Sequence, residues 1–331
     1  MKLLSSCALG ALTLASLFWH GTAQANPPRG PEAVADPEVS SDIDLTSFEI
    51  KPESPQLPSE ILVVTRKIGD FEWHTDYTTA YREAEREKKM LFIFFRDDAH
   101  PRTANSYESQ VLASKELAGD LKKVVRVVLP LSTRRPQRDP SETERTLITH
   151  DSFKHMHGRE GIAMIDLTDP KSEHQGQVVS AHPFSSGYHT TVHGTKLVLS
   201  LPKGSITQRA LIFAVRQHPA SPLSTASGQC HGYLCKAARD SSQLMASYGS
   251  VGHHDWGTRQ GDIAARTGRS AMEVAAMSGN PSLLAAAAEI VEQWYGSPSH
   301  WGILSTPATF FGFDLVRDGA GNWWGTGIVA N

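Results

Sequence analysis

The chain has 331 residues, of which 40% are hydrophobic, and this length is enough for two globular domains. Its 32 basic and 35 acidic residues give a formal net charge of -3, so there is no basic stripe and no acidic tail. This balance excludes nucleic acid as an expected partner. We therefore look for function in a pocket or a local surface.

The N-terminus is typical of a secretory signal peptide over residues 1–25. Lys2 precedes an apolar run from Leu3 to Phe18, and Ala23-Gln24-Ala25 has the small residues of a cleavage site. The alternative is a retained membrane anchor, which the short run disfavours because a spanning helix needs about 20 apolar residues. We expect an exported protein, periplasmic or extracellular, that is not integral to the membrane after cleavage.

A proline-rich linker is expected at residues 26–60, where acidic and serine residues accompany the prolines. An α/β domain over residues 61–218 should follow, beginning with a strand at Ile61 to Val64. Thr75-Asp76 is a helix cap, and it predicts a helix from Tyr77 to Lys88 before a buried strand at Leu91 to Phe95. The remaining elements expected in this domain are a helix of about fourteen residues around Tyr107, Val111 and Leu117, strands at 124–129, 161–167, 176–181 and 197–201, and a helix at 206–217.

This first domain resembles the thioredoxin-like fold. The resemblance rests on Trp73, the capped helix, the Lys88-Lys89 pair, the apolar strand and the Val111-Leu112 pair. Thioredoxin chemistry requires a Cys-x-x-Cys motif at a helix start, and here Pro101 and Ala104 occupy those positions. Arg159-Glu160-Gly161 stands where the family usually has its cis-proline. The resemblance therefore implies a scaffold or interaction module and no thiol oxidoreductase activity at that place.

A second linker is predicted at residues 219–229, followed by an α+β domain over residues 230–331. Its expected elements are a helix ending at Gly249, a helix opened by Asn280-Pro281, and a terminal hairpin with strands at 310–316 and 323–329. Cys230 and Cys235 open this domain. In an oxidising compartment they favour a local disulfide, with two partly buried free thiols as the alternative.

Three short polar clusters mark the second domain: residues 252–259, residues 273–276 and residues 294–301. Their order, with the hairpin that follows, resembles the bacterial branch of the CAP/SCP-like superfamily (cysteine-rich secretory, antigen 5 and pathogenesis-related proteins). The run from Trp294 to His300 parallels the tryptophan and Ser-Pro-Gly-His pattern of that family. Glu273-Val274-Ala275-Ala276 stands where the family has Glu-Asn-Ile-Ala and keeps only the glutamate and the final alanine. The resemblance covers residues 232–331 and implies an α-β-α sandwich.

In that family two histidines and one or two glutamates face a shared cleft, which sometimes holds a divalent metal. The resemblance implies His253, Glu273 and His300 as the cleft residues here, and His254 is an alternative to His253. Further residues expected beside the cleft are Ser297 and Trp301. Two imidazoles and one carboxylate could also ligate zinc with one open position, which makes this trio a tentative metal site. No nucleophile with a positioned base is visible, so Glu273 is only a candidate catalytic residue.

Two functional hypotheses follow. The first is an exported binding protein of the cell envelope whose partner is a lipid, a cell-wall fragment or another protein. The alternative is a metal-dependent hydrolase, in which Glu273 is a ligand or the general base for a bound water. A structural role for each histidine and for the glutamate is also open, because a buried carboxylate can simply accept hydrogen bonds from the backbone.

Export can be tested by expressing the full chain in a bacterium with an intact secretion pathway and sequencing the N-terminus of the exported product. The expected first residue is Asn26, because the small residues before it fit signal peptidase. A product that keeps Lys2 and stays in the membrane fraction would support the anchor instead.

Overall fold

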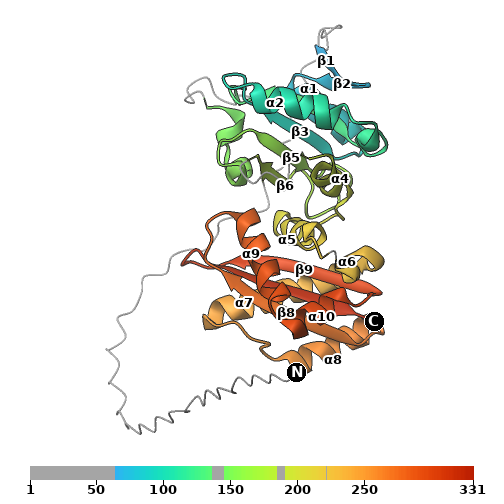
Figure 1. Cartoon of the computed structure of the whole chain (residues 1–331), viewed down its shortest axis with the longest axis vertical. Coiled ribbons are helices and arrows are strands. Elements are labelled where there is room, and N and C mark those ends of the chain that lie inside the picture. The colour runs from blue at the N-terminus through green and yellow to red at the C-terminus, as the bar shows by residue number, and fades with distance from the viewer. Residues whose placement is uncertain (1–63, 136–144, 185–190, 221) are drawn as a thin grey trace, which may run out of the picture. The chain divides into compact units, whose positions relative to one another are not determined.

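The computed structural model describes residues 64–135, 145–184, 191–220 and 222–331 (Figure 1). The expected signal peptide, the proline-rich linker and nearly all of the strand expected at residues 61–64 lie outside these ranges. Residues 60–331 cluster into one compact unit, a mixed α/β fold with two mixed sheets. Within the described ranges, no helix combines the length and the apolar character needed to cross a membrane.

The first sheet has strand order β1-β2-β4-β3-β5-β6. Its central strands β4 and β3 are parallel, whereas β5 and β6 are antiparallel to their neighbours and β1 forms a hairpin with β2. Strands β3, β5 and β6 are almost entirely buried because other parts of the chain pack on both faces of the sheet. The strand bounds are β1 (Thr65–Ile68), β2 (Phe71–His74), β3 (Leu91–Arg96), β4 (Val125–Pro130), β5 (Gly161–Ile165) and β6 (Val178–Pro183).

Helices cover this sheet at positions close to those expected. The side chain of Asp76 accepts from the Thr79 backbone N–H at 2.7 Å, which starts α1 where the cap predicted it. Ala80 and Ala84 on α1 are buried against the sheet. The helical elements of this half are α1 (Tyr77–Glu87), α2 (Arg102–Ser106), the π-helix η1 (Tyr107–Leu112), the 3₁₀-helix η2 (Lys115–Leu117), α3 (Ala118–Leu121), the 3₁₀-helices η3 (Leu147–Thr149) and η4 (Asp151–Met156), α4 (Val192–Ser200) and α5 (Ile206–Gln217).

Two expectations for this half are wrong. The predicted fourteen-residue helix is divided into short segments, and its centre is the π-turn η1, in which the Ala113 N–H donates to the Glu108 carbonyl at 3.0 Å. The predicted strand at residues 197–201 belongs instead to α4, whose first turn is capped when the Gly194 N–H donates to the Thr191 hydroxyl at 2.9 Å. The cap and the helical spacing of buried positions outweigh the apolar run there.

The second sheet has strand order β7-β9-β10-β8. Strand β10 pairs antiparallel with β8 and β9, and β7 pairs parallel with β9. The expected hairpin is present as β9 and β10, and the expected helix end at Gly249, in the left-handed conformation, is the C-terminus of α7. The bounds are α6 (Leu223–Ser227), β7 (Gln229–Cys230), α7 (Gly232–Tyr248), α8 (Trp256–Thr267), β8 (Ala271–Ser278), α9 (Leu283–Tyr295), α10 (Pro298–Ser305), β9 (Phe310–Arg317) and β10 (Trp323–Ala330). The stretch expected as a linker thus contains α6 and β7.

Alternate residues of β9 face helices on opposite sides of the second sheet. The Phe313 ring lies 6.2 Å from that of Trp294 on α9, centroid to centroid. Gly312 faces α7, and a Cβ atom at this glycine would lie 2.3 Å from the backbone nitrogen of Cys235. The second sheet is therefore a middle layer between α7 on one face and α9 with α5 on the other.

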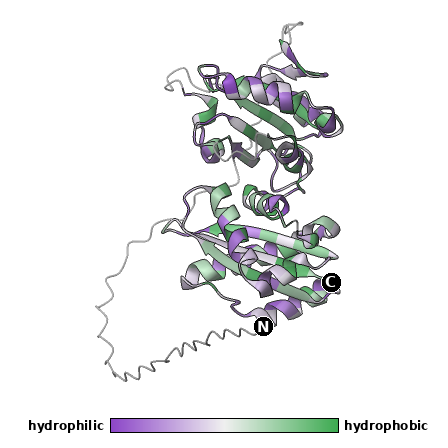
Figure 2. Cartoon of the chain, in the orientation of Figure 1, coloured by the Kyte–Doolittle hydropathy of each residue, from purple (hydrophilic) through white to green (hydrophobic). Residues whose placement is uncertain are grey.

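Helix α5 packs against β6 of the first sheet and also against α9 and β9. Its N-terminus carries a complete capping box formed by Ser205 and Gln208. The buried carboxylate of Asp314 on β9 accepts from the Thr207 hydroxyl at 2.6 Å and from the Gln208 amide at 3.1 Å. Figure 2 shows hydrophobic residues along α5 and the central strands, as a helix covered on several sides requires.

The close approach at Gly312 predicts that Gly312→Ala destabilises the fold by about 3 kcal/mol, because the added methyl collides with backbone atoms that cannot move aside. Urea unfolding followed by tryptophan fluorescence measures this loss. The matched control is Gly261→Ala inside α8, where no described atom lies within 4 Å of the added carbon. It should gain about 0.8 kcal/mol from helix propensity. Equal stability of the two variants would contradict this close packing.

Candidate functional site

The second half positions a polar cluster at the edge of its sheet. Glu273 lies on β8, with neighbouring Val274 packed into the core shared with α9. His253 lies in the loop between α7 and α8, and His300 lies on α10. The loop before α8 and the first turn of α8 thus meet Glu273 on β8, and His300 on α10 lies beside His253.

Glu273 has a side chain only 1% exposed, and three groups bond to it. The Arg259 guanidinium forms a bidentate ion pair with the carboxylate, in which Nη2 donates to Oε1 at 2.9 Å and Nη1 donates to Oε2. His253 Nδ1 lies 3.0 Å from Oε1, and the Ser241 hydroxyl also bonds to the carboxylate. Burial acts to raise the pKa of Glu273, but the hydrogen bonds from Arg259 and His253 outweigh it and the pKa is lowered.

The two histidines face each other across this cluster. Their ring centroids are 6.0 Å apart, and the side chain of His253 is 44% exposed. Partial burial lowers the pKa of His300, and the charge that His253 can carry lowers it further. Because the ionised Glu273 carboxylate can only accept, His253 carries a proton on Nδ1 and presents Nε2 to other partners.

Arg259 itself is held in place from two further directions. Its Nε donates to the His254 carbonyl at 2.9 Å, and its guanidinium carbon lies 5.1 Å from the centroid of the Trp256 ring. The sequence interpretation gave Arg259 no direct place in the site. Its position three to four residues after Asp255 and Trp256, on the first turn of α8, was the available signal.

Three of the predicted site residues lie elsewhere. His254 turns away from Glu273, with its ring 4.7 Å from that of Tyr248 and its Nε2 3.1 Å from the Ser250 carbonyl. Ser297 contacts the Ser299 hydroxyl at 3.2 Å. The ring of Trp301 packs 4.7 Å from His218 and 5.1 Å from Tyr295, so this tryptophan fills the contact between α10 and α5.

The cluster does not fit the zinc centre considered from the sequence. Both oxygens of Glu273 already accept from Arg259, whose positive charge opposes a second cation at the same carboxylate. His253 uses Nδ1 on that carboxylate as well. In the described part of the chain, no group of three or more histidine, cysteine, aspartate or glutamate side chains is arranged to hold a metal ion. The geometry instead provides an oriented imidazole beside a buried ion pair.

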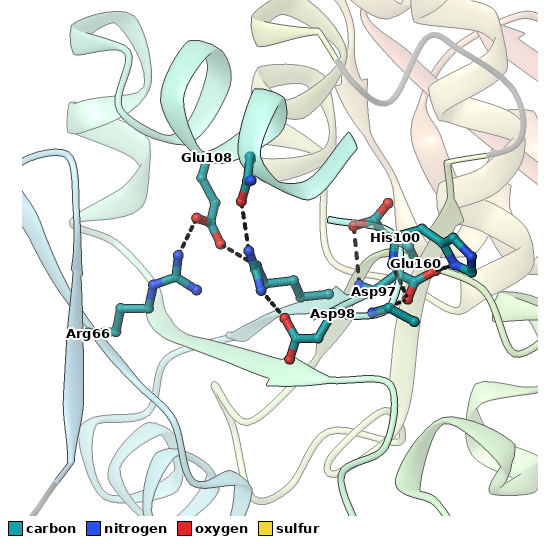
Figure 3. Close-up of polar contacts among 9 residues, drawn as sticks. Arg66, Asp97, Asp98, His100, Glu108 and Glu160 are labelled. Atoms are coloured by element: carbon teal, nitrogen blue, oxygen red, sulfur yellow. Dashed lines mark hydrogen bonds and ion pairs between the residues drawn. The ribbon is translucent and has the colours of Figure 1, made fainter. Parts of the chain in front are cut away.

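The first half contains a second polar network at the end of β3, which the sequence interpretation missed. In Figure 3 the side chains of Arg66 and Glu108 point toward each other, and the Arg66 Nη2 donates to Glu108 Oε2 at 2.5 Å. Arg96 donates from Nε to Glu108 Oε1 at 3.1 Å, from Nη2 to Asn105 at 2.7 Å, and from Nη1 to Asp98. The run Arg96-Asp97-Asp98 directly after an apolar strand was the signal for this network.

This network surrounds the segment where the thioredoxin resemblance would place a redox motif. Asp97 accepts from the backbone of Ala99 and from the ring of His100, whose hydrogen bond is the main cause of the lowered pKa of Asp97. Glu160, which accepts from the Asp97 N–H at 3.3 Å, has a raised pKa because it is partly buried. Figure 3 shows these groups side by side. Charged side chains thus occupy the end of β3.

The predicted disulfide is not formed in the structure. Cys230 and Cys235 carry free thiols whose Sγ atoms are 3.5 Å apart, compared with the ~2.05 Å of a disulfide bond. Of the two alternatives considered from the sequence, the structure has the free thiols.

Comparisons with known proteins identify no related protein. No protein-family model matches the chain, and searches of curated proteins and of solved structures find no significant match. The functional argument therefore depends on the geometry of the chain itself.

The lowered pKa of Glu273 predicts a pH-dependent effect of Glu273→Gln on stability. A carboxyl whose pKa is lowered by folding stabilises the protein above its unfolded pKa, and this contribution is lost as the pH falls through its folded pKa. The variant should be less stable than the original by about 2 kcal/mol at pH 7, and the difference should shrink progressively in acid.

Urea unfolding at a series of pH values from 7 downward measures this difference. The control is Glu116→Gln, an exposed residue of the 3₁₀-helix η2, which should change stability little at any pH. A Glu273→Gln effect that stays constant with pH would contradict the linkage.

Proposed function

We propose that the protein is an exported binding protein with no redox chemistry at its thioredoxin-like position, and that its binding site is the cluster of His253, Arg259, Glu273 and His300. Residues 230–331 act in this proposal as a CAP/SCP-like domain, and residues 61–218 act as a thioredoxin-like scaffold. The middle-layer position of the second sheet supports the first assignment, and the arrangement of central parallel strands β3 and β4 supports the second.

The observation that carries the proposal is a buried, fully paired carboxylate on β8 that holds His253, whose partly exposed imidazole lies beside His300 of α10. Burying an ion pair carries a desolvation penalty that offsets most of the attraction between the charges. Stability of the fold alone is therefore a weak reason for this ion pair. It does fix the orientation of His253. A fixed imidazole next to His300 suits recognition of a polar group by hydrogen bonds.

A polar ligand is favoured over an acyl chain because the lining groups are imidazoles and a guanidinium. Among the partners considered from the sequence, a cell-wall fragment rich in hydroxyl, amide and carboxylate groups meets this requirement. A metal-dependent hydrolase is disfavoured because Glu273 has no free oxygen for a metal. A serine nucleophile activated by His253 is also disfavoured, because the hydroxyl of Ser297 contacts that of Ser299.

Binding can be tested by titrating soluble peptidoglycan fragments into the full chain while histidine side-chain signals are followed by NMR. The expected result is a saturable shift of the His253 and His300 signals. His253→Ala and His300→Ala should each weaken binding about ten-fold, because each removes a hydrogen-bonding group at the site. The control His193→Ala, an exposed residue on α4, should bind as tightly as the original protein.

Anionic phospholipid vesicles form the second arm of this experiment. Binding to vesicles that is unaffected by both histidine substitutions, with no response to the peptidoglycan fragments, would contradict the proposed site. Hydrolysis of the fragments during the titration would contradict the assignment as a binding protein.

A further inference from the structure

Cys230 and Cys235 are in contact yet have different surroundings. Cys230 is half-buried in β7, where pairing with Phe311 of β9 fixes its backbone. Cys235 is buried in the first turn of α7, where its N–H donates to the His231 carbonyl at 3.0 Å. Their Sγ atoms are 3.5 Å apart, so the two sulfurs are already in contact.

The environment makes Cys230 the more reactive thiol. A hydrogen bond from the Cys235 thiol is the main cause of its lowered pKa, and the positive charge of Arg216 adds to it. The Arg216 guanidinium is held by the Ser200 and Thr225 carbonyls, each at 3.3 Å. For Cys235 the same hydrogen bond and burial raise the pKa strongly. Cys230 is thus suited to attack a disulfide first, and Cys235 is suited to attack in the second step.

Both cysteines line a cavity of about 260 Å³. Side chains of opposite charge stand around it, with Glu173 and exposed Lys203 contributed by segments of the first half. His174 and Gln208 complete its polar lining. The cavity is too small for a folded partner, and its charges match a small molecule with both a carboxylate and an ammonium group.

We propose that Cys230 and Cys235 form a redox-active dithiol that reduces a small zwitterionic disulfide, of the type made by two amino acids, bound in this cavity. The Cys230 thiolate attacks one sulfur of the disulfide, and the broken S–S bond releases the first thiol after protonation. The Cys235 sulfur loses its proton and attacks Cys230 Sγ, which releases the second thiol. The protein dithiol is oxidised to a disulfide, and an external dithiol reductant restores it by the reverse exchange.

This site is separate from the position where the thioredoxin resemblance would place its cysteines. It is also independent of the His253 cluster, so failure of one proposal leaves the other standing. Three features distinguish this site: the contact between the two sulfurs, the lowered pKa of Cys230, and the cavity that both cysteines line.

The experiment uses the full chain carrying Cys7→Ser, which leaves Cys230 and Cys235 as its two cysteines. The reduced protein is mixed with cystine or with neutral hydroxyethyl disulfide, and mass spectrometry follows the products. We expect oxidation of the pair with cystine at a rate about ten-fold above that with the neutral disulfide. Adding Lys203→Gln should reduce the cystine rate about five-fold, as loss of one exposed ion pair allows.

Trapping variants separate the roles of the two sulfurs. In the same background, Cys235→Ser should accumulate one cysteinyl adduct on Cys230, whereas Cys230→Ser should form none because burial raises the pKa of the Cys235 thiol. Urea unfolding of each variant establishes that it is folded. Adducts on both folded variants, on neither, or no preference for cystine would overturn the proposal.

Discussion

The second half of the protein depends on one charge that water does not reach, the carboxylate of Glu273 on β8. An unpaired carboxylate at this depth would cost several kcal/mol, so the surrounding segments must supply donors. Arg259 from α8 neutralises the charge, and His253 and Ser241 complete the hydrogen bonds. This requirement brings the loop after α7 and the first turn of α8 to the edge of the sheet.

The same solution sets the chemistry of the site. Because Arg259 occupies both oxygens of Glu273, the carboxylate directs His253 and is not itself offered to a ligand. His300 on α10 stays neutral over a wider pH range than an isolated imidazole, since burial and His253 lower its pKa. The result is two neighbouring imidazoles with a buried salt bridge behind them, which is an arrangement for recognition more than for metal chemistry.

A second buried carboxylate, Asp314, links the two sheets through the N-terminus of α5. It accepts from Thr207 and Gln208 there, and Gln208 also lines the cavity beside the cysteines. The negative charge of Asp314 contributes to the raised pKa of Cys235. The cysteine pair and the contact between the two halves therefore share Gln208 and the charge of Asp314.

Local patterns in the sequence determined where most elements begin and end, because each pattern involves only residues that are close along the chain. The examples are the Asp76 cap, the Ser205 capping box, the Gly249 helix end and the turn from Asp318 to Asn322. The sequence also indicated that His253, Glu273 and His300 should be neighbours. Only the tertiary structure decided that Arg259 occupies the carboxylate and that Trp301 packs against His218. Those outcomes follow from packing between distant segments, which determines where each side chain finds its partner and cannot be read from spacing along the chain.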